Sequence, residues 1–517
     1  MKRTILALIM TCCSFVLKAQ VNTFSTTFNI FNGDEALCVI QNSAGNYVVC
    51  GSVYPGGSTL DPFVAEISTS GSILQAWTIT TSTTTEIFRS IVQTSDGGYF
   101  LTGAFGASPS DYTALVMKLD ASFGIEFYKQ FGVTGINDNA NRAFEISPGH
   151  YGFTGSIGLG GSVKPSLVIL DQSGNIIQQS YLGTNQFASP DYRGRYFGNG
   201  EVAMGHLTNA FTILDTTGAV VKSFGSGLGI FSVDVQRLSN GNYACLSLDN
   251  YGAPTGESTS LLIADSTCTN TLQLRKYSIG GLSLQPSEFI ENANGDLLIV
   301  GRTESMSSGN QTPVLVKTSS NGALNWAKSY LPAGAPSAKF NSIAATSDGG
   351  YIMCGHSGPF NAQKMLLVKV DSTGDISNCS VTGLSLTSAF ATTNLSSTHP
   401  VYSGTVTGVN ATATLYQDTV SQQVLCLNVG LGAETSGPEV VVYPSPAGQQ
   451  LNIQGLETQR IQIEIYDRNG ALVLKSNRMA SALMDVQLQS LSDGLYLLIL
   501  RSDSGELILN KRFVKAQ

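Results

Sequence analysis

One short phrase recurs seven times between residues 43 and 355, and its spacing constrains the fold more than any other feature. It consists of a polar turn and then an apolar run that ends in glycine, as in residues 95–103 and 347–355. Self-similarity at a period of about 50 residues is typical of folds built from repeated small sheets. The positions that close the phrase are Gly51, Gly103, Gly155, Gly205, Ser247, Gly301 and Gly355.

A second phrase completes each repeat. An apolar run leads to an aspartate turn that ends in glycine, and a further short run follows, as in residues 115–131. Glycine supplies the positive φ that tight turns require, and aspartate caps the turn through its side chain. Each repeat therefore predicts two β-hairpins, and the seven repeats predict an all-β, seven-bladed β-propeller over residues 20–376. A solenoid or a pair of stacked sheets is the alternative.

The two ends of the repeat region predict how the ring closes. Six repeats end in a strand such as residues 127–131, but the seventh has no such strand after Gly374. A spare copy lies at residues 24–30. We expect this N-terminal strand to complete the last blade, because an open ring would leave strand edges unpaired.

The repeats resemble bacterial propeller repeats with a Ser-Asp-Gly-Gly-Tyr signature, which is intact at residues 95–99 and 347–351. The resemblance covers residues 20–376 and implies the fold and a secreted surface protein. It implies no activity, because propellers serve as lyases, hydrolases, lectin-like binders and scaffolds alike.

Residues 377–437 differ sharply in composition from the repeats. They contain no lysine or arginine, and 20 of the 61 residues are serine or threonine. Such a stretch predicts either an extended linker or a small β-module. Cys379 and Cys426 bracket it, and we expect a disulfide between them in an oxidising compartment. The pairing of the other mature cysteines stays open, including a Cys38–Cys50 bridge; they are Cys38, Cys50, Cys245, Cys268 and Cys354.

Residues 438–517 alternate in hydrophobicity, with turns every 8–12 residues, which predicts a small β-sandwich. The order of its motifs resembles the type A C-terminal sorting domain of the type IX secretion system of Bacteroidota. That family usually opens on Tyr-Pro-Asn-Pro, whereas Ser445 replaces the asparagine here. The resemblance implies contact with the secretion machinery, transit of the outer membrane, and then removal of the domain with release or surface attachment. A carbohydrate-binding sandwich is the alternative. The matching motif residues are Tyr443, Pro444, Pro446, Gly494, Tyr496 and Lys511.

The first residues have the pattern of an export signal. Lys2 and Arg3 precede an apolar stretch at residues 4–17, and Ala19 precedes Gln20 at the expected cleavage point. We therefore expect a signal peptide over residues 1–19 and a secreted or surface location. A short membrane anchor and a lipoprotein are the alternatives. No later run of 18 apolar residues occurs, so we expect no transmembrane segment in the mature chain.

Composition and motifs give little indication of nucleic-acid binding, catalysis, or metal or cofactor binding. The formal net charge of −8 argues against a nucleic-acid surface, which needs a basic stripe. The chain has four histidines and lacks a Gly-x-Ser-x-Gly elbow, a Walker loop and a His-Glu-x-x-His motif. We expect no catalytic residue, cofactor or metal.

The repeat geometry nevertheless indicates where a ligand would bind. Both signature turns lie on one face of the predicted disc, so the variable loops lie on the other face, around the channel mouth. We expect a non-enzymatic propeller that binds a glycan, protein or surface component. An extracellular polysaccharide hydrolase or lyase with carboxylates on the loop face is the alternative. The candidate ligand-binding residues are Arg89, Asp111, Tyr112, Asp138, Arg142, His206, Tyr251, Arg302 and His356.

Overall fold

The computed structural model divides into two compact units, Met1–Gly430 and Leu431–Gln517, and no described residue is helical. No helix of the described part is long and apolar enough to cross a membrane. The predicted signal peptide with Ala19 and Gln20 lies outside the described residues. The structure describes residues 21–515 except 32, 57–58, 80–83, 109–110, 133–134, 160–161, 183–193, 207–209, 226–230, 250–255, 306, 360–361, 378, 380, 391–400, 404–407, 411–414, 418–420, 429–440, 444–446, 455, 457, 468–470, 482 and 504–506.

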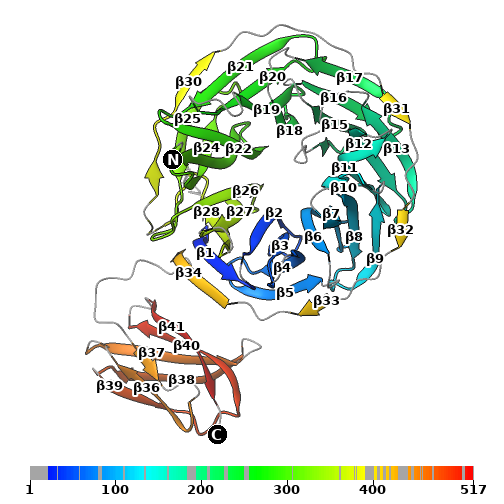
Figure 1. Ribbon diagram of the computed structural model, residues 1–517. Helices are drawn as coiled ribbons and strands as arrows, with labels where there is room; N and C mark the ends of the chain where they lie inside the picture. Colours follow the sequence, from blue (N-terminus) through cyan, green and yellow to red (C-terminus); the bar gives the residue numbers. More distant parts are fainter. Residues whose placement is uncertain are drawn as a thin grey trace, which may run out of the picture. The chain divides into compact units, whose positions relative to one another are not determined.

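The described residues of the first unit form seven antiparallel sheets, which we number as blades in chain order and which lie in a ring (Figure 1). Blade 1 comprises β2 (Glu35–Gln41), β3 (Tyr47–Val53), β4 (Asp61–Ile67) and β5 (Ile73–Ile79). Blade 2 comprises β6 (Thr85–Gln93), β7 (Tyr99–Ser108), β8 (Asp111–Leu119) and β9 (Ile125–Phe131). Blade 3 comprises β10 (Asn139–Ser147), β11 (His150–Leu159), β12 (Ser162–Leu170) and β13 (Ile176–Leu182).

The remaining blades follow the same order of strands. Blade 4 comprises β14 (Arg195–Tyr196), β15 (Glu201–His206), β16 (Ala210–Asp215) and β17 (Val220–Gly225). Blade 5 comprises β18 (Phe231–Arg237), β19 (Tyr243–Asp249), β20 (Ser258–Ala264) and β21 (Thr271–Ser278). Blade 6 comprises β22 (Leu282–Glu291), β23 (Leu297–Ser305), β24 (Gln311–Thr318) and β25 (Leu324–Ser329). Blade 7 comprises β26 (Ala338–Ala345), β27 (Tyr351–Ser357), β28 (Lys364–Val370) and β1 (Thr23–Asn29).

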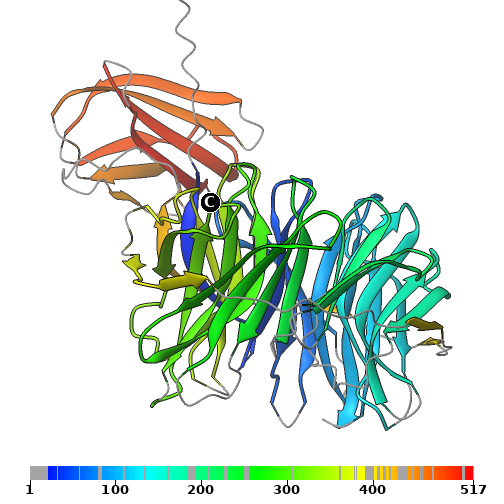
Figure 2. The same cartoon turned by 90° about the horizontal axis from the view of Figure 1, so that it is seen from above.

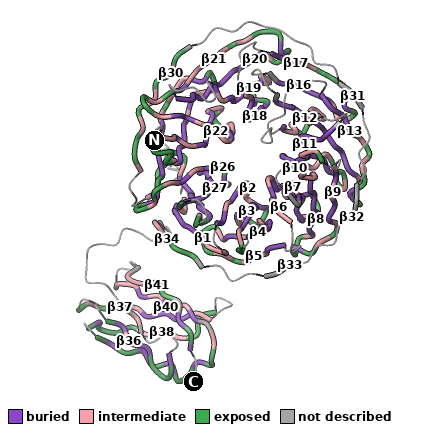
Figure 3. The backbone as a smooth tube through the Cα atoms, viewed as in Figure 1, coloured by how far each residue is buried: buried purple, intermediate pink, exposed green. Residues whose placement is uncertain are grey.

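Burial follows the position of each strand in its blade. The second strand is buried on both faces, as in β3 and β27, because neighbouring blades pack against it. The fourth strand begins with exposed or partly exposed residues, as in β5 and β13. Figure 3 shows the resulting gradient from buried inner strands to an exposed rim. The core is therefore distributed between adjacent blades.

Five of the glycines that close the phrase, at positions 51, 103, 155, 301 and 355, are required by a close approach of two strands. A Cβ on Gly103 would lie well inside 3.0 Å of the backbone oxygen of Ile87. A Cβ on Gly155 would meet the backbone oxygen of Asn139 in the same way. These glycines sit in the second strand, opposite the point where the first strand bulges. The repeated glycine therefore reflects backbone packing, whereas Gly97 in the preceding turn has a φ of +85°.

The polar turn of one blade is bound by the first strand of the next blade. The Ser95 backbone N–H and hydroxyl donate to Glu145 at 2.6 and 2.9 Å. Glu291 accepts the same two bonds from Ser239 at 2.6 and 2.8 Å. These bonds join blade 2 to blade 3 and blade 5 to blade 6. The serine of the signature is thus an inter-blade contact as well as a turn residue.

The same contacts join the seventh blade to the first. The Ser347 N–H donates to Gln41 Oε1 at 2.7 Å, and β2 packs beside both β6 and β26. The N-terminal strand β1 pairs with β28 in register from Phe24 opposite Lys369 to Phe28 opposite Met365. The sheet of blade 7 is therefore completed by the N-terminal strand.

The Ser/Thr-rich segment lies along the blades in a way that the sequence did not indicate. Six short strands of this segment, which we call the belt, each pair with the outer edge of a different blade (Figures 1 and 2). Our expectation of an extended linker or a small β-module is corrected for these strands, because they pair with the open backbone groups of the outer blade edges. The belt strands are β29 (Thr382–Gly383), β30 (Thr387–Phe390), β31 (Val401–Ser403), β32 (Gly408–Asn410), β33 (Leu415–Gln417) and β34 (Ser421–Asn428).

The structure pairs Cys379 with Cys426 at a Cα–Cα distance of 6.2 Å. The other described cysteines are buried and not disulfide-bonded, although Cys38 and Cys50 face each other across the first hairpin. They fill core positions, as expected of buried thiols.

The second unit contains two antiparallel sheets around one apolar core. Tyr496 is buried in this core, stacks on Phe513 at 5.7 Å between ring centroids, and donates its hydroxyl to the Ser492 carbonyl at 2.8 Å. Lys511 is exposed, and Pro444 and Pro446 lie outside the described residues. The strands are β35 (Val441–Tyr443), β36 (Gln450–Gln454), β37 (Arg460–Asp467), β38 (Leu472–Met479), β39 (Leu483–Gln487), β40 (Gly494–Ser502) and β41 (Leu507–Lys515).

Candidate functional site

The first strands of six blades bulge at the same place. The register shifts by one residue in β2, β6, β10, β18, β22 and β26. The residue after each bulge lies thirteen positions before the residue that closes the phrase, as Arg142 does before Gly155 and Glu288 before Gly301. These inner residues, which we call the channel positions, are Cys38, Ser90, Arg142, Asp234, Glu288 and Ser342.

Four of the channel positions accept a hydrogen bond from the backbone of the next blade. Ser90 Oγ accepts from the Ala143 N–H at 3.1 Å, and Ser342 Oγ accepts from the Val39 N–H at 3.4 Å. The bond to Val39 crosses from blade 7 to blade 1. These side chains therefore join inner strands around the channel.

The two acidic channel positions make the same contact. Asp234 Oδ2 accepts from the Phe289 N–H at 3.4 Å, and Glu288 Oε2 accepts from the Ile343 N–H at 3.2 Å. These bonds join blade 5 to blade 6 and blade 6 to blade 7. Each carboxylate therefore binds a backbone N–H of the next blade in addition to its ionic contacts.

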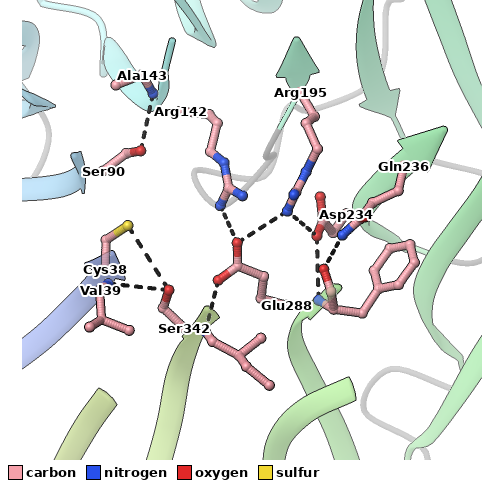
Figure 4. A network of polar contacts seen from close by, with 12 residues as sticks. Cys38, Val39, Ser90, Arg142, Ala143, Arg195, Asp234, Gln236, Glu288 and Ser342 are labelled. Carbon is pink, nitrogen blue, oxygen red and sulfur yellow. Dashed lines mark hydrogen bonds and ion pairs between the residues drawn. The ribbon is translucent and has the colours of Figure 1, made fainter. Parts of the chain in front are cut away.

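Two arginines, from blades 3 and 4, complete an ionic network with these carboxylates (Figure 4). Arg142 Nη1 lies 2.5 Å from Glu288 Oε1. Arg195 Nη2 lies 3.2 Å from the same oxygen and 3.0 Å from Asp234 Oδ2. We call these four residues the channel network; it links blades 3, 4, 5 and 6.

The channel network is buried and electrically balanced. The side chains of Asp234 and Glu288 are 0% and 3% exposed, and those of Arg142 and Arg195 are 14% and 21% exposed. Burial acts to lower the pKa of Arg142, but Glu288 and Asp234 outweigh it and raise that pKa. Burial and the neighbouring Arg142 lower the pKa of Arg195. The two cations and two anions are largely shielded from water and pair with one another, so they link the blades that carry them.

The candidate ligand-binding residues lie in several separate parts of the propeller. Arg142 lies in the channel network, and Arg89 is the half-buried bulge residue of β6. His206 ends β15, and its side chain is not described. Tyr251 lies outside the described residues. The candidates whose side chains the structure describes do not form one cluster.

Two candidate aspartates shape the loops of blades 2 and 3. Asp111 Oδ1 accepts from the Gly135 N–H at 2.8 Å. Asp138 is fully buried and accepts from the Gly158 N–H. The Tyr112 N–H in turn donates to Asn137 Oδ1 at 3.1 Å. Both carboxylates thus hold backbone amides.

Arg302 and His356 occupy two other places. Arg302 Nε lies 3.5 Å from Glu304 Oε2, in a pair that is partly exposed. His356 is buried on β27, with Nδ1 3.4 Å from Glu35 Oε1. Lys339 Nζ lies 2.8 Å from the same oxygen, so this cluster joins blade 1 to blade 7.

Sequence reasoning missed Arg195, Asp234 and Glu288. A signal for two of them was present, because Asp234 and Glu288 share the thirteen-residue offset of Arg142. Arg195 belongs to blade 4, whose first strand is only two residues long in the described structure. Because this repeat is degenerate, the thirteen-residue offset from Gly205 does not lead to Arg195.

The described residues contain no group of three or more His, Cys, Asp or Glu side chains that could hold a metal ion. An apolar gap lined by Tyr277, Leu284 and Val316 lies between blades 5 and 6 and includes none of the candidate residues. Among the described residues, the channel network brings together four charged side chains from four blades, and these charges are paired with one another.

No curated protein matches the chain. Among solved structures, Sqt1 from Chaetomium thermophilum is 14% identical, with a TM-score of 0.39, over 66% of this chain and 87% of that chain. The Neurospora crassa Pan2 WD40 domain is 11% identical, with a TM-score of 0.41, over 65% and 89%. A fungal alcohol oxidase of the AA5 family, in complex with copper, is 12% identical, with a TM-score of 0.42, over 96% and 100%. These scores are below 0.5, so our description of the fold rests on the strand pairing.

Residues 441–515 match the family model of the secretion system C-terminal sorting domain. The matched segment contains the motif residues Tyr443, Gly494 and Tyr496. The match indicates export by the type IX secretion system, to the cell surface or the extracellular space. The chain therefore carries a type IX C-terminal sorting domain after its β-propeller.

Proposed function

We propose that the exported propeller is a non-enzymatic binding protein that recognises a glycan, a protein or another surface component through its loop face. The signal peptide over residues 1–19 first delivers the chain to the periplasm. The sorting domain then directs it across the outer membrane.

One observation carries the non-enzymatic part of this proposal. Each acidic channel position accepts a backbone N–H of the next blade and also faces an arginine. Ser90 and Ser342 make the same backbone contact without any charge. Because acidic and neutral side chains make the same backbone contact, we infer that the channel positions hold neighbouring blades together. Recognition of the ligand is then the task of the variable loops.

The test is a glycan and polysaccharide array probed with the exported protein and scored for both binding and cleavage. We expect saturable binding to at least one class of glycan, or capture by a defined surface component, without new chain ends. Release of shortened products would contradict the proposal.

A second function has one observation in its favour. Asp234 and Glu288 both contact Nη2 of Arg195, so two carboxylates lie close together, as in polysaccharide hydrolases. Under this alternative, Asp234→Asn abolishes cleavage of a polysaccharide and leaves binding intact.

The route of export is tested separately, by deleting residues 438–517 in the native host. We expect the truncated chain to remain in the periplasm. Unchanged delivery to the medium or the surface would contradict the assignment of export to this domain.

A further inference from the structure

The belt strands follow the ring in the reverse order of the blades. Along the chain, β29 pairs with β25 of blade 6 and β30 with β21 of blade 5. The next strands pair with blades 3, 2 and 1, through β13, β9 and β5. The last strand, β34, pairs with β1 of blade 7. The described belt thus reaches six blades and returns to the place where the repeats end.

The disulfide lies where the belt begins and ends. Cys379 follows the last turn of blade 7, and Cys426 lies in β34 opposite Ser25 of β1. The N-terminal strand therefore has β28 on one edge and β34 on the other. The Ser377 N–H also donates to Thr23 Oγ1 at 3.0 Å, which places the start of the belt beside the start of β1.

We infer that the Cys379–Cys426 disulfide turns residues 379–426 into a covalently closed loop, the hoop, whose described strands lie along the outer edges of six blades. The hoop locks the N-terminal strand into blade 7. The inference goes beyond the proposed binding function and does not depend on it.

The hoop closes when the thiols of Cys379 and Cys426 are oxidised to a disulfide. The two cysteine thiols exchange with a disulfide-bearing oxidant, so that one sulfur–sulfur bond forms in this chain and one breaks in the oxidant. The oxidant leaves with two thiols, and the chain loses two hydrogens. An oxidising compartment supplies such a donor, so the hoop closes after export from the cytoplasm.

The hoop acts on β1 through proximity. A reduced belt end can detach from β1 and diffuse away, whereas a closed hoop holds it at a high effective concentration. Detachment would expose both β34 and one edge of β1 to solvent. Reduction therefore loosens the pairing of β34 with β1, at the outer edge of blade 7, before it affects the inner strands.

A thiol titration tests closure of the hoop. The full-length exported protein is denatured without reductant and its thiols are counted. Five are expected after removal of residues 1–19, namely Cys38, Cys50, Cys245, Cys268 and Cys354. Seven thiols would overturn the inference.

Amide hydrogen exchange tests whether the hoop holds β1 in blade 7. We expect exchange in β1 and β34 to accelerate about tenfold or more on reduction, and to be equally fast in the Cys379→Ser/Cys426→Ser variant without reductant. Exchange in the inner strand β22 is expected to stay unchanged. Reductant added to the double variant is the matched control and should have no effect.

Two results would overturn the lock. One is an unchanged exchange rate in β1 and β34 when the disulfide is reduced. The other is equal acceleration in β22, because this would mean that the disulfide stabilises the whole ring and not the outer edge of blade 7 in particular.

Discussion

Replacing Glu288 by glutamine removes the charge at the centre of the channel network while keeping the shape of the side chain. Glu288 contacts Arg142 at 2.5 Å and Arg195 at 3.2 Å, and it is 3% exposed. Arg195 keeps Asp234, so Arg142 is the cation that loses its partner. Removing one member of a buried pair costs about 3–5 kcal/mol. Because the arginines keep some solvent contact, we expect a loss of about 3 kcal/mol, at the lower end of that range.

The measurement is the free energy of unfolding in guanidinium, followed by tryptophan fluorescence. The chain has two tryptophans, Trp77 in blade 1 and Trp326 in blade 6, so the signal reports the propeller and not the sorting domain. Glu304→Gln is the matched control, because its partner Arg302 is partly exposed. That change should cost less than about 1 kcal/mol.

A double-mutant cycle isolates the contact between Arg142 and Glu288. Glu288→Gln combined with Arg142→Gln should recover part of the loss, with a coupling energy of about 1–3 kcal/mol. The reasoning is refuted if Glu288→Gln costs no more than Glu304→Gln, or if the coupling energy is near zero. Either result would mean that the channel network does not brace the ring.

Three further changes test other parts of the structure. Gly155→Ala should cost about 1–3 kcal/mol in unfolding free energy, because its Cβ would meet the Asn139 carbonyl, whereas Gly280→Ala has open space and should be nearly neutral; equal effects would contradict the close approach. Burial acts to raise the pKa of Glu35, but Lys339 and His356 outweigh it and lower that pKa below the ordinary 4.5. The stability from Glu35 is therefore present above pH 4.5 and is lost as the pH falls towards the folded pKa; Glu35→Gln should flatten the acid side of a stability-against-pH curve, and an unchanged slope would contradict this. In the Cys379→Ser/Cys426→Ser variant, limited proteolysis under oxidising conditions should cut the belt at a lower protease concentration than in the parent, and equal cleavage would show that the disulfide constrains little.

The blades could be predicted from the sequence because their determinants are local. A glycine with positive φ, such as Gly97, and an aspartate that binds backbone amides, such as Asp96, act within one hairpin. Repetition of that hairpin then predicted the sheets and the N-terminal strand of blade 7. The sorting domain could be predicted for the same reason, since its motifs keep their order and spacing.

The belt and the channel network could not be predicted in this way, because their contacts are distant in sequence. Val409 pairs with Gln130, and nothing in a Ser/Thr-rich strand specifies which blade edge it will join. Arg195 and Glu288 are 93 residues apart, and a two-residue strand in a degenerate repeat supplies the arginine. Burial beside one another on the inner strands creates their interaction, and the sequence pattern alone does not reveal it.

The central claim is that the exported ring binds its target and does not cleave it. The most direct measurement incubates the exported protein with each polysaccharide that it binds and counts new reducing ends or unsaturated ends over time. The account predicts saturable binding with no increase in chain ends above the protein-free control. An increase that Asp234→Asn abolishes without loss of binding would contradict the account and establish the channel carboxylates as catalytic.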